Sequence, residues 1–166
     1  MSLGEGSGSS IGYETMRGRD YPAIRQFTVF VENRVGMLTS LIRRFLGSEV
    51  RLLSMNIVDS TECSLIRMVF SHPEAGREIL ERAGLAMVES DLLAVELKNG
   101  EQPLLEVSTA LLQAEVNLIQ TCALMVPNHH ANVLGILVDN FDLACDILAS
   151  RKFRLLTEND LQDLSQ

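Results

Sequence analysis

The sequence has little of what several classes of protein require. Its 166 residues include 14 basic residues against 22 acidic ones, and no basic cluster exceeds the pair Arg43-Arg44. Binding to a nucleic-acid backbone or an anionic membrane needs a positive stripe. With a net charge of −8, we therefore expect neither nucleic acid nor a membrane surface as a partner. No apolar run approaches the roughly 18 residues of a membrane-spanning helix.

The sequence has few cysteines, and their spacing matches no paired cysteine motif. The three cysteines are Cys63, Cys122 and Cys145, and the first residues lack the apolar core of a secretion signal. An odd number of cysteines without such a signal is typical of free thiols in a reducing compartment. The sequence therefore predicts a cytoplasmic protein, with a Gly/Ser-rich flexible leader over residues 1–24.

Motifs for nucleotide, metal or covalent chemistry are also missing. The sequence contains neither a GxxxxGK[ST] nor a GxGxxG phosphate-binding loop. His129, His130 and Cys122 could be metal ligands. Adjacent histidines without a second, spaced pair of ligands are poor metal ligands, however, so this stretch favours a polar hairpin tip. Cys63 or Cys145 with His72 is a poor catalytic pair, because both cysteines fall at core or strand-edge positions. We predict no metal, no cofactor and no catalytic residue.

An internal repeat is present instead. When the sequence is shifted by 66 residues, apolar positions coincide without a gap from Gln26 to Ser54: Phe27 falls on Leu93 and Leu41 on Val107. "LGSEVRL" (46–52) falls on "LQAEVNL" (112–118), and a shift of 68 places "EILERAGL" on "DILASRKF". So long a period indicates two copies of one supersecondary unit.

Each copy has the same order of elements. Alternation at Phe27, Val29 and Val31 predicts a strand, and apolar residues from Leu38 to Phe45 recur at helical spacing. Two strands, a helix opened by Pro73 and a closing strand follow. The order βαββαβ, twice, predicts an α+β fold of two ferredoxin-like modules, each an antiparallel sheet with helices on one face. We expect the modules at residues 25–89 and 90–157, and a tail at 158–166.

One face of each such sheet is left without helices. Phe30 and similar apolar residues belong on this face, and an exposed apolar face is typical of a contact with a partner or a second copy. We therefore expect the two copies to pair side by side, and further chains to cover what remains.

The stretch "ENRVGML" (32–38) joins the first strand to the first helix. The first amides of a helix have no internal partner and carry the positive end of its dipole, so they suit a carboxylate. Gly36 permits close approach, Asn33 can hold the turn or contact a ligand, and Arg34 can pair with a carboxylate. A strand-to-helix turn also needs Gly and Asn for backbone reasons alone, so connector and ligand site both remain open.

The stretch "FTVFVENRVGMLTSLIRRF" resembles the ACT domain family of small regulatory βαββαβ modules. Its "VENRVGML" is most similar to the regulatory (small) subunit of acetohydroxyacid (acetolactate) synthase, while the second half resembles a general tandem ACT domain. The resemblance covers about residues 25–160. It implies that an amino acid binds at this turn, against the second strand of a neighbouring module.

Each copy holds part of the family pattern, which has an Asn-x-x-Gly turn and an Asn opening the second strand. Copy one has Asn33 and Gly36 but Arg51; copy two has Asn99 and Asn117 but Gln102 in place of the glycine. Side-by-side copies would then form one hybrid site from the Gly36 turn and the Asn117 strand. The candidate ligand residues are Asn33, Arg34, Val35, Gly36, Met37, Leu38, Arg51, Asn99, Gly100, Gln102, Leu104 and Asn117.

The leading hypothesis is a non-catalytic regulatory module that binds a small effector, by resemblance an amino acid. The apolar rim formed by Val35, Met37 and Leu38 favours an aliphatic one. Effector binding would be sensed by a partner enzyme, and the resemblance implies acetolactate synthase as an example. We expect the chain to form a homodimer. The alternatives are a stand-alone sensor or structural homodimer without ligand binding, and a small ferredoxin-like enzyme that uses the open sheet face.

Overall fold

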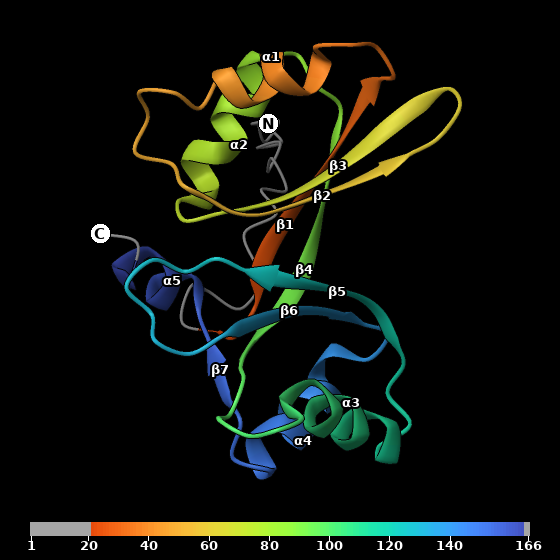
Figure 1. Cartoon of the computed structure of the whole chain (residues 1–166), viewed down its shortest axis with the longest axis vertical. Coiled ribbons are helices and arrows are strands. Elements are labelled where there is room, and N and C mark those ends of the chain that lie inside the picture. Colours follow the sequence, from red (N-terminus) through yellow and green to blue (C-terminus); the bar gives the residue numbers. More distant parts are fainter. Residues whose placement is uncertain (1–20, 165–166) are drawn as a thin grey trace, which may run out of the picture.

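The computed structural model describes residues 21–164 and shows helices at the two ends of the molecule with strands between them (Figure 1). Most of the leader expected at residues 1–24 thus lies outside the described residues. The strands form one seven-stranded sheet in the order β2-β3-β1-β4-β6-β5, and β7 also pairs with β4. All the strand pairs are antiparallel.

The first module has the predicted order of elements. Phe27, Val29 and Val31 alternate toward its helices, as the sequence pattern predicts. Pro73 opens the second helix, where its missing N–H costs nothing. The elements are β1 (Ile24–Glu32), α1 (Met37–Arg43), β2 (Leu52–Asp59), β3 (Cys63–Phe70), α2 (Pro73–Arg82) and the first part of β4 (Met87–Glu96).

The second module repeats this order and starts inside β4. Pro103 opens its first helix, and Asn140 caps the second by accepting a hydrogen bond from the Leu143 amide at 3.2 Å. The elements after β4 are α3 (Pro103–Gln113), β5 (Leu118–Leu124), β6 (Val133–Val138), α4 (Phe141–Ser150), β7 (Arg154–Leu156) and α5 (Glu158–Leu164). The structure thus confirms two ferredoxin-like modules, and the expected tail contains a helix.

β4 belongs to both modules. Its first part pairs with β1, from Met87 opposite Val29 to Leu92 opposite Ile24. Its last part pairs with β6 and with β7. The sequence led us to expect a closing strand and a separate opening strand, but the structure has one continuous strand. The boundary expected between residues 89 and 90 lies in its interior.

Each module buries its own core between sheet and helices. In the first, Phe27 and Phe70 lie with their ring centroids 5.5 Å apart, and Leu80 of α2 is fully buried above them. In the second, Leu93 and Val95 of β4 pack with Leu111 of α3 and Leu148 of α4. Burying such side chains supplies about 1.5–3 kcal/mol each.

A third core joins the modules through their helix-free faces. Ile24 and Leu92 of the first module pack in one cluster with Leu124, Val133 and Leu156 of the second. The modules therefore pack face to face in this region, which differs from the expected side-by-side pairing. β4 runs from one unit into the other (Figure 1), and the strands of a sheet twist relative to one another.

Polar groups fix the register of this interface. The buried Gln26 of β1 accepts a hydrogen bond from Gln120 Nε2 on β5 at 2.7 Å and donates to Ser90 Oγ at 3.2 Å. The Met125 amide after β5 donates to the Leu53 carbonyl of β2 at 2.7 Å. Farther along the first sheet the face is not covered by the second module, and Phe30 is 43% exposed.

The helix α5 fastens the modules together. Leu161 is buried in the third core, and Asp160 accepts from the Thr157 amide at 2.8 Å to cap the helix. Glu158 accepts from the Arg25 amide at 3.0 Å and from its guanidinium at 2.9 Å, while Glu74 of α2 lies 2.6 Å from the same guanidinium. Burial alone lowers the pKa of Arg25, but the bonds from Glu158 and Glu74 outweigh it and raise that pKa.

We predict that Glu158→Gln lowers the free energy of unfolding by about 1–3 kcal/mol, because it leaves a buried guanidinium short of a charged partner. Urea unfolding monitored by circular dichroism measures the change. The control is Glu78→Gln, which removes an exposed pair with Arg82 at 3.3 Å and should cost about 0.5 kcal/mol or less. Equal losses in the two variants would contradict the fastening role of Glu158.

Candidate functional site

The turn between β1 and α1 is a compact backbone unit. The Arg34 amide donates to the Glu32 carbonyl at 2.8 Å, and the Met37 amide donates to the Arg34 carbonyl at 3.2 Å. Gly36 lies at φ 87° and ψ −8°, in the left-handed region, and its carbonyl accepts from the Ser40 amide at 2.9 Å. One of the helix amides expected to be free for a ligand, that of Met37, is therefore used within the turn.

Asn33 ties this turn to the neighbouring hairpin. Its side-chain amide donates to the Ser60 carbonyl, at the tip between β2 and β3, at 3.2 Å. The tip is closed by Ser60 Oγ, which donates to the Cys63 carbonyl at 2.8 Å. Of the two roles left open for Asn33, holding the turn is the one for which the structure contains a contact.

A cavity of about 260 Å³ lies between the turn and the ends of β2 and β3. Its apolar part comes from β1, β2, β3 and the start of α1, and its charged rim carries two carboxylates and one guanidinium. The lining residues are Val31, Glu32, Asn33, Arg34, Met37, Leu38, Ile57, Asp59, Ser64 and Ile66.

The charges of the rim are arranged in two groups. Arg34 pairs with Glu32 at 2.5 Å, and both side chains are 68% exposed. Asp59 Oδ1 accepts from Ser64 Oγ at 2.6 Å across the β2–β3 pair. A guanidinium and two carboxylates beside an apolar floor suit a small molecule with charges of both signs and an aliphatic side chain.

Comparison with known proteins decides the family. The family described as "ACT domain pair" matches residues 22–165. The chain belongs to the ACT domain pair family. ACT domains are regulatory and typically bind amino acids. The sequence matches no curated protein.

Two solved structures show the same ACT-type fold. Protein BT0572 from Bacteroides thetaiotaomicron is 21% identical, with a TM-score of 0.75 over 84% of this chain and 96% of that one. The regulatory subunit of aspartate kinase from Thermus thermophilus is 10% identical, with a TM-score of 0.52 over 77% of this chain and 91% of that one. At these identities the likeness concerns the fold alone.

Within the first ACT module, the structure brings four predicted residues to the cavity: Asn33, Arg34, Met37 and Leu38. Val35 is fully exposed. A Cβ on Gly36 would meet no atom within 4 Å. Glycine is therefore required here by the positive φ and not by a lack of space for a side chain. Some residues of the turn therefore line the cavity, whereas Gly36 serves only the conformation of the backbone.

Arg51 lies away from this cavity. It precedes β2, at the end opposite Asp59, and its amide donates to Ser71 Oγ at 2.9 Å. At that position it helps to pair the start of β2 with the end of β3.

The second ACT module places its predicted residues differently. Gln102 is the N-cap residue before α3 and has φ −136°, far from the left-handed region of Gly36. Leu104 is 55% exposed, and the Asn117 amide donates to Asp139 Oδ1 at 3.0 Å. Asn99 and Gly100 lie in the connection between β4 and α3.

The structure does not bring the Gly36 turn and Asn117 together in one chain. The cavity at the turn is lined by residues 31–66 only, all from the first module. The hydrogen bond from the Met125 amide, just after β5, reaches β2 at Leu53, at the end of β2 opposite Asp59. A site completed by a second module therefore requires another copy of the chain.

Sequence reasoning missed the residues that the hairpin supplies. Ile57 lies opposite Ile66, and Asp59 lies opposite Ser64. The available signal was the strand order of the predicted unit, which puts the third strand beside the first and the hairpin tip beside Glu32. Asp59 and Ser64 flank the polar turn, so this signal was enough to add them.

Several titratable groups lie outside the cavity at the β1–α1 turn. Burial raises the pKa of the Cys122 thiol, which keeps it protonated. Burial also raises the pKa of Glu89, which lies 2.6 Å from Arg77. His129 lies in the β5–β6 connection, 3.1 Å from Glu96. Across residues 21–164 no three potential metal ligands cluster, no disulfide joins the three cysteines, and no helix has the length and apolarity to cross a membrane.

We predict that Gly36→Ala lowers the free energy of unfolding by about 1–2 kcal/mol, because a Cβ is unfavourable at positive φ. Gly100→Ala, at the corresponding connection of the second module, is the control: its φ is outside the left-handed region and its Cβ meets only Glu106 Oε1, at 3.4 Å. We expect a change within about 0.5 kcal/mol there. Urea unfolding of both variants measures the difference, and a neutral Gly36→Ala would refute the conformational role.

Proposed function

We propose that this chain is a non-catalytic regulatory protein that binds an amino acid in the cavity beside the β1–α1 turn. The observation that supports this most directly is the cavity itself, with an apolar floor and charges of both signs on its rim. Membership of a regulatory family that typically binds amino acids supports the same proposal.

The charged groups define the orientation of the effector. Arg34 is the donor for its carboxylate, and Asp59 with Glu32 is the acceptor for its ammonium group. The exposed pair of Arg34 with Glu32 contributes about 1 kcal/mol or less, so exchanging it for ligand contacts costs little. Ile57, Ile66 and Leu38 then face an aliphatic side chain.

We propose that the working form is a homodimer joined along β2. The strand from Met55 to Asp59 is exposed, and Ile57 and Val58 are 44% and 40% exposed. β2 is the end strand of the sheet, so its outer edge offers unpaired backbone groups that a second β2 can satisfy. A second copy there would lie beside the cavity and complete it.

Regulation follows from a difference in affinity. If the effector binds more tightly to one arrangement of the modules, its binding shifts the population toward that arrangement. A partner enzyme of amino-acid biosynthesis would respond to the shift. The stretch "VENRVGML" points to acetolactate synthase with a branched-chain amino acid, and the fold of the aspartate kinase regulatory subunit makes aspartate kinase the second candidate.

The alternative is a stand-alone structural or sensor homodimer that has no ligand. It is favoured by the exposed apolar edge of β2 taken alone, since that edge needs a second copy but no effector. Ligand binding separates the two proposals.

We predict that aliphatic L-amino acids raise the melting temperature of the wild-type chain, by an amount that grows with concentration. At a hundredfold excess over Kd the stabilisation is about 2.7 kcal/mol. Arg34→Ala and Asp59→Asn should each weaken binding at least about tenfold by isothermal titration, because each removes a charge-assisted hydrogen bond.

The matched control for this titration is Arg43→Ala, an exposed arginine on α1 outside the cavity. It should leave Kd unchanged. If none of the standard L-amino acids alters the melting temperature, the effector proposal is wrong and the structural homodimer stands.

We predict that the wild-type chain is a dimer by light scattering, and that Val58→Lys shifts it toward monomer by placing a charge on the β2 edge. Val88→Lys is the control, because Val88 is 55% exposed on β4 of the same module. A monomeric wild type, or equal dissociation of both variants, would argue against pairing along β2.

A further inference from the structure

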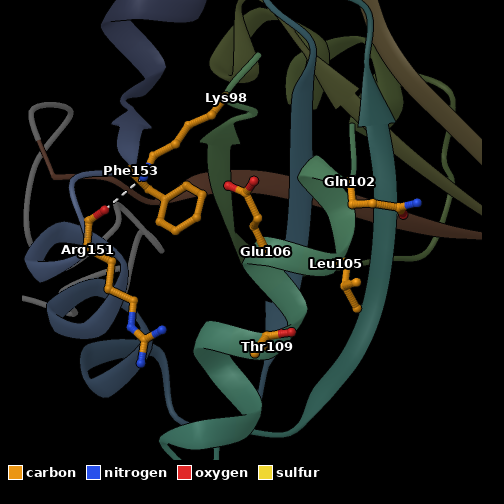
Figure 2. A pocket seen from close by; sticks show the side chains of 7 residues that line it. All are labelled: Lys98, Gln102, Leu105, Glu106, Thr109, Arg151 and Phe153. Carbon is orange, nitrogen blue, oxygen red and sulfur yellow. Dashed lines mark hydrogen bonds between the residues drawn. The ribbon is translucent and has the colours of Figure 1, made fainter. Parts of the chain in front are cut away.

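The second module contains a larger cavity, of about 400 Å³, between α3 and the turn that joins α4 to β7 (Figure 2). It shares no lining residue with the cavity at the β1–α1 turn. Its volume falls within the range of small-molecule sites, roughly 300–1,000 Å³. Nothing in the regulatory proposal above uses it.

A fixed cation lies at one side of this cavity. Lys98 Nζ donates to the Arg151 carbonyl at 2.9 Å and lies 4.1 Å from the centroid of the Phe153 ring (Figure 2). A lysine held by two contacts loses less conformational freedom on binding an anion than a solvated one does. An ammonium group has three donors, so two remain after the bond to the carbonyl.

An anion lies on the facing helix. Glu106 extends from α3 toward the Phe153 ring (Figure 2), and no ion pair between it and Lys98 is among the described contacts. Its side chain is exposed, and Gly100 of the β4–α3 connection abuts it: a Cβ there would lie 3.4 Å from Glu106 Oε1. The cavity thus separates one positive and one negative group, with apolar surface between them.

The remaining lining residues provide one apolar and one polar wall. Phe153 is buried under Lys98, and Leu105 of α3 is 59% exposed beside Thr109. The Arg151 guanidinium is held by Gln113 Oε1 at 2.5 Å. A molecule that spans Lys98 and Glu106 would cover the exposed Leu105 with its own apolar part and would touch only the small part of the ring that Lys98 and the core leave open, so the favourable burial of apolar area comes mainly from Leu105.

We propose that this cavity is a second binding site, for a zwitterion with an apolar side chain. The ligand carboxylate contacts Lys98 Nζ, and the ligand ammonium group contacts the Glu106 carboxylate. The apolar side chain lies against Phe153 and Leu105. In a chain of net charge −8, a ligand with charges of both signs binds here without the repulsion that a simple anion would meet.

Lys98 also has a structural function, since a cation at the carbonyl of Arg151 stabilises the C-terminal end of α4. Loss of binding in Lys98→Met alone would therefore be ambiguous. The Glu106 side chain has no hydrogen bond or ion pair among the described contacts of the cavity, and the bond from its backbone amide to the Gln102 carbonyl does not depend on the side chain. Glu106→Gln therefore changes a charge without removing a contact of the fold. It is the decisive variant.

The test uses the full chain and the standard L-amino acids, each added alone, with binding followed by amide chemical shifts and by titration calorimetry. An amino acid in this cavity should shift the amides of Gly100, Glu106 and Thr109. Glu106→Gln should weaken that binding about tenfold or more. Its melting temperature without ligand should fall only slightly, because a carboxylate in the first turn of α3 interacts favourably with the helix dipole. The N-acetyl derivative of the same amino acid lacks the ammonium charge and should bind wild type and Glu106→Gln equally weakly.

Variants of the other cavity keep the two sites distinct. Arg34→Ala should leave the shifts at Glu106 and Thr109 intact even where it removes those at the β1–α1 turn. If no standard L-amino acid shifts the amides around Glu106, the second site does not exist. If Glu106→Gln binds as tightly as wild type, recognition of a zwitterion is refuted, whatever happens at the turn.

Discussion

The continuity of β4 is the constraint on which the rest of the structure depends. A single strand closes the first module and opens the second, so no flexible linker separates the two units. Alternate residues of this strand serve different cores: Leu93 and Val95 face the helices of the second module, whereas Leu92 and Ala94 face the layer between the modules. The pleat of one strand thereby fixes the relative orientation of both units.

Under this constraint the cavity at the β1–α1 turn is lined by the first module alone. β1 and β2 enter the shared core at Ile24 and Leu53, and their opposite ends, Glu32 and Asp59, meet at the cavity. The outer edge of β2 beside it is exposed and apolar. The geometry therefore divides the first sheet into an end that holds the chain together and an end available to a ligand and a second copy. The Arg25–Glu158 contact belongs to the first of these ends.

The two copies have diverged in backbone chemistry as well as in ligand residues. Gly84 and Lys152 occupy corresponding positions under the shift of 68, and both have positive φ, 69° and 60°. Gly36 and Gln102 also correspond, yet only the glycine is left-handed. The second copy thus keeps one such conformation at the end of α4 and loses the other at the start of α3. The cavity of the second copy lies between α3 and the α4–β7 turn.

The sequence by itself determined the elements and their order. Periodicities of two and of 3.6 residues, the prolines at 73 and 103 and the internal shift of 66 are local or repeated signals, and they predicted βαββαβ twice and the turn at Gly36. Only the tertiary structure decided that residues 87–96 form one strand, that the helix-free faces pack together, and that Asp59 and Ser64 join Arg34 at a cavity. Those outcomes depend on strand twist and on contacts between residues distant in the chain, and hydrophobic spacing along one segment carries no information about either.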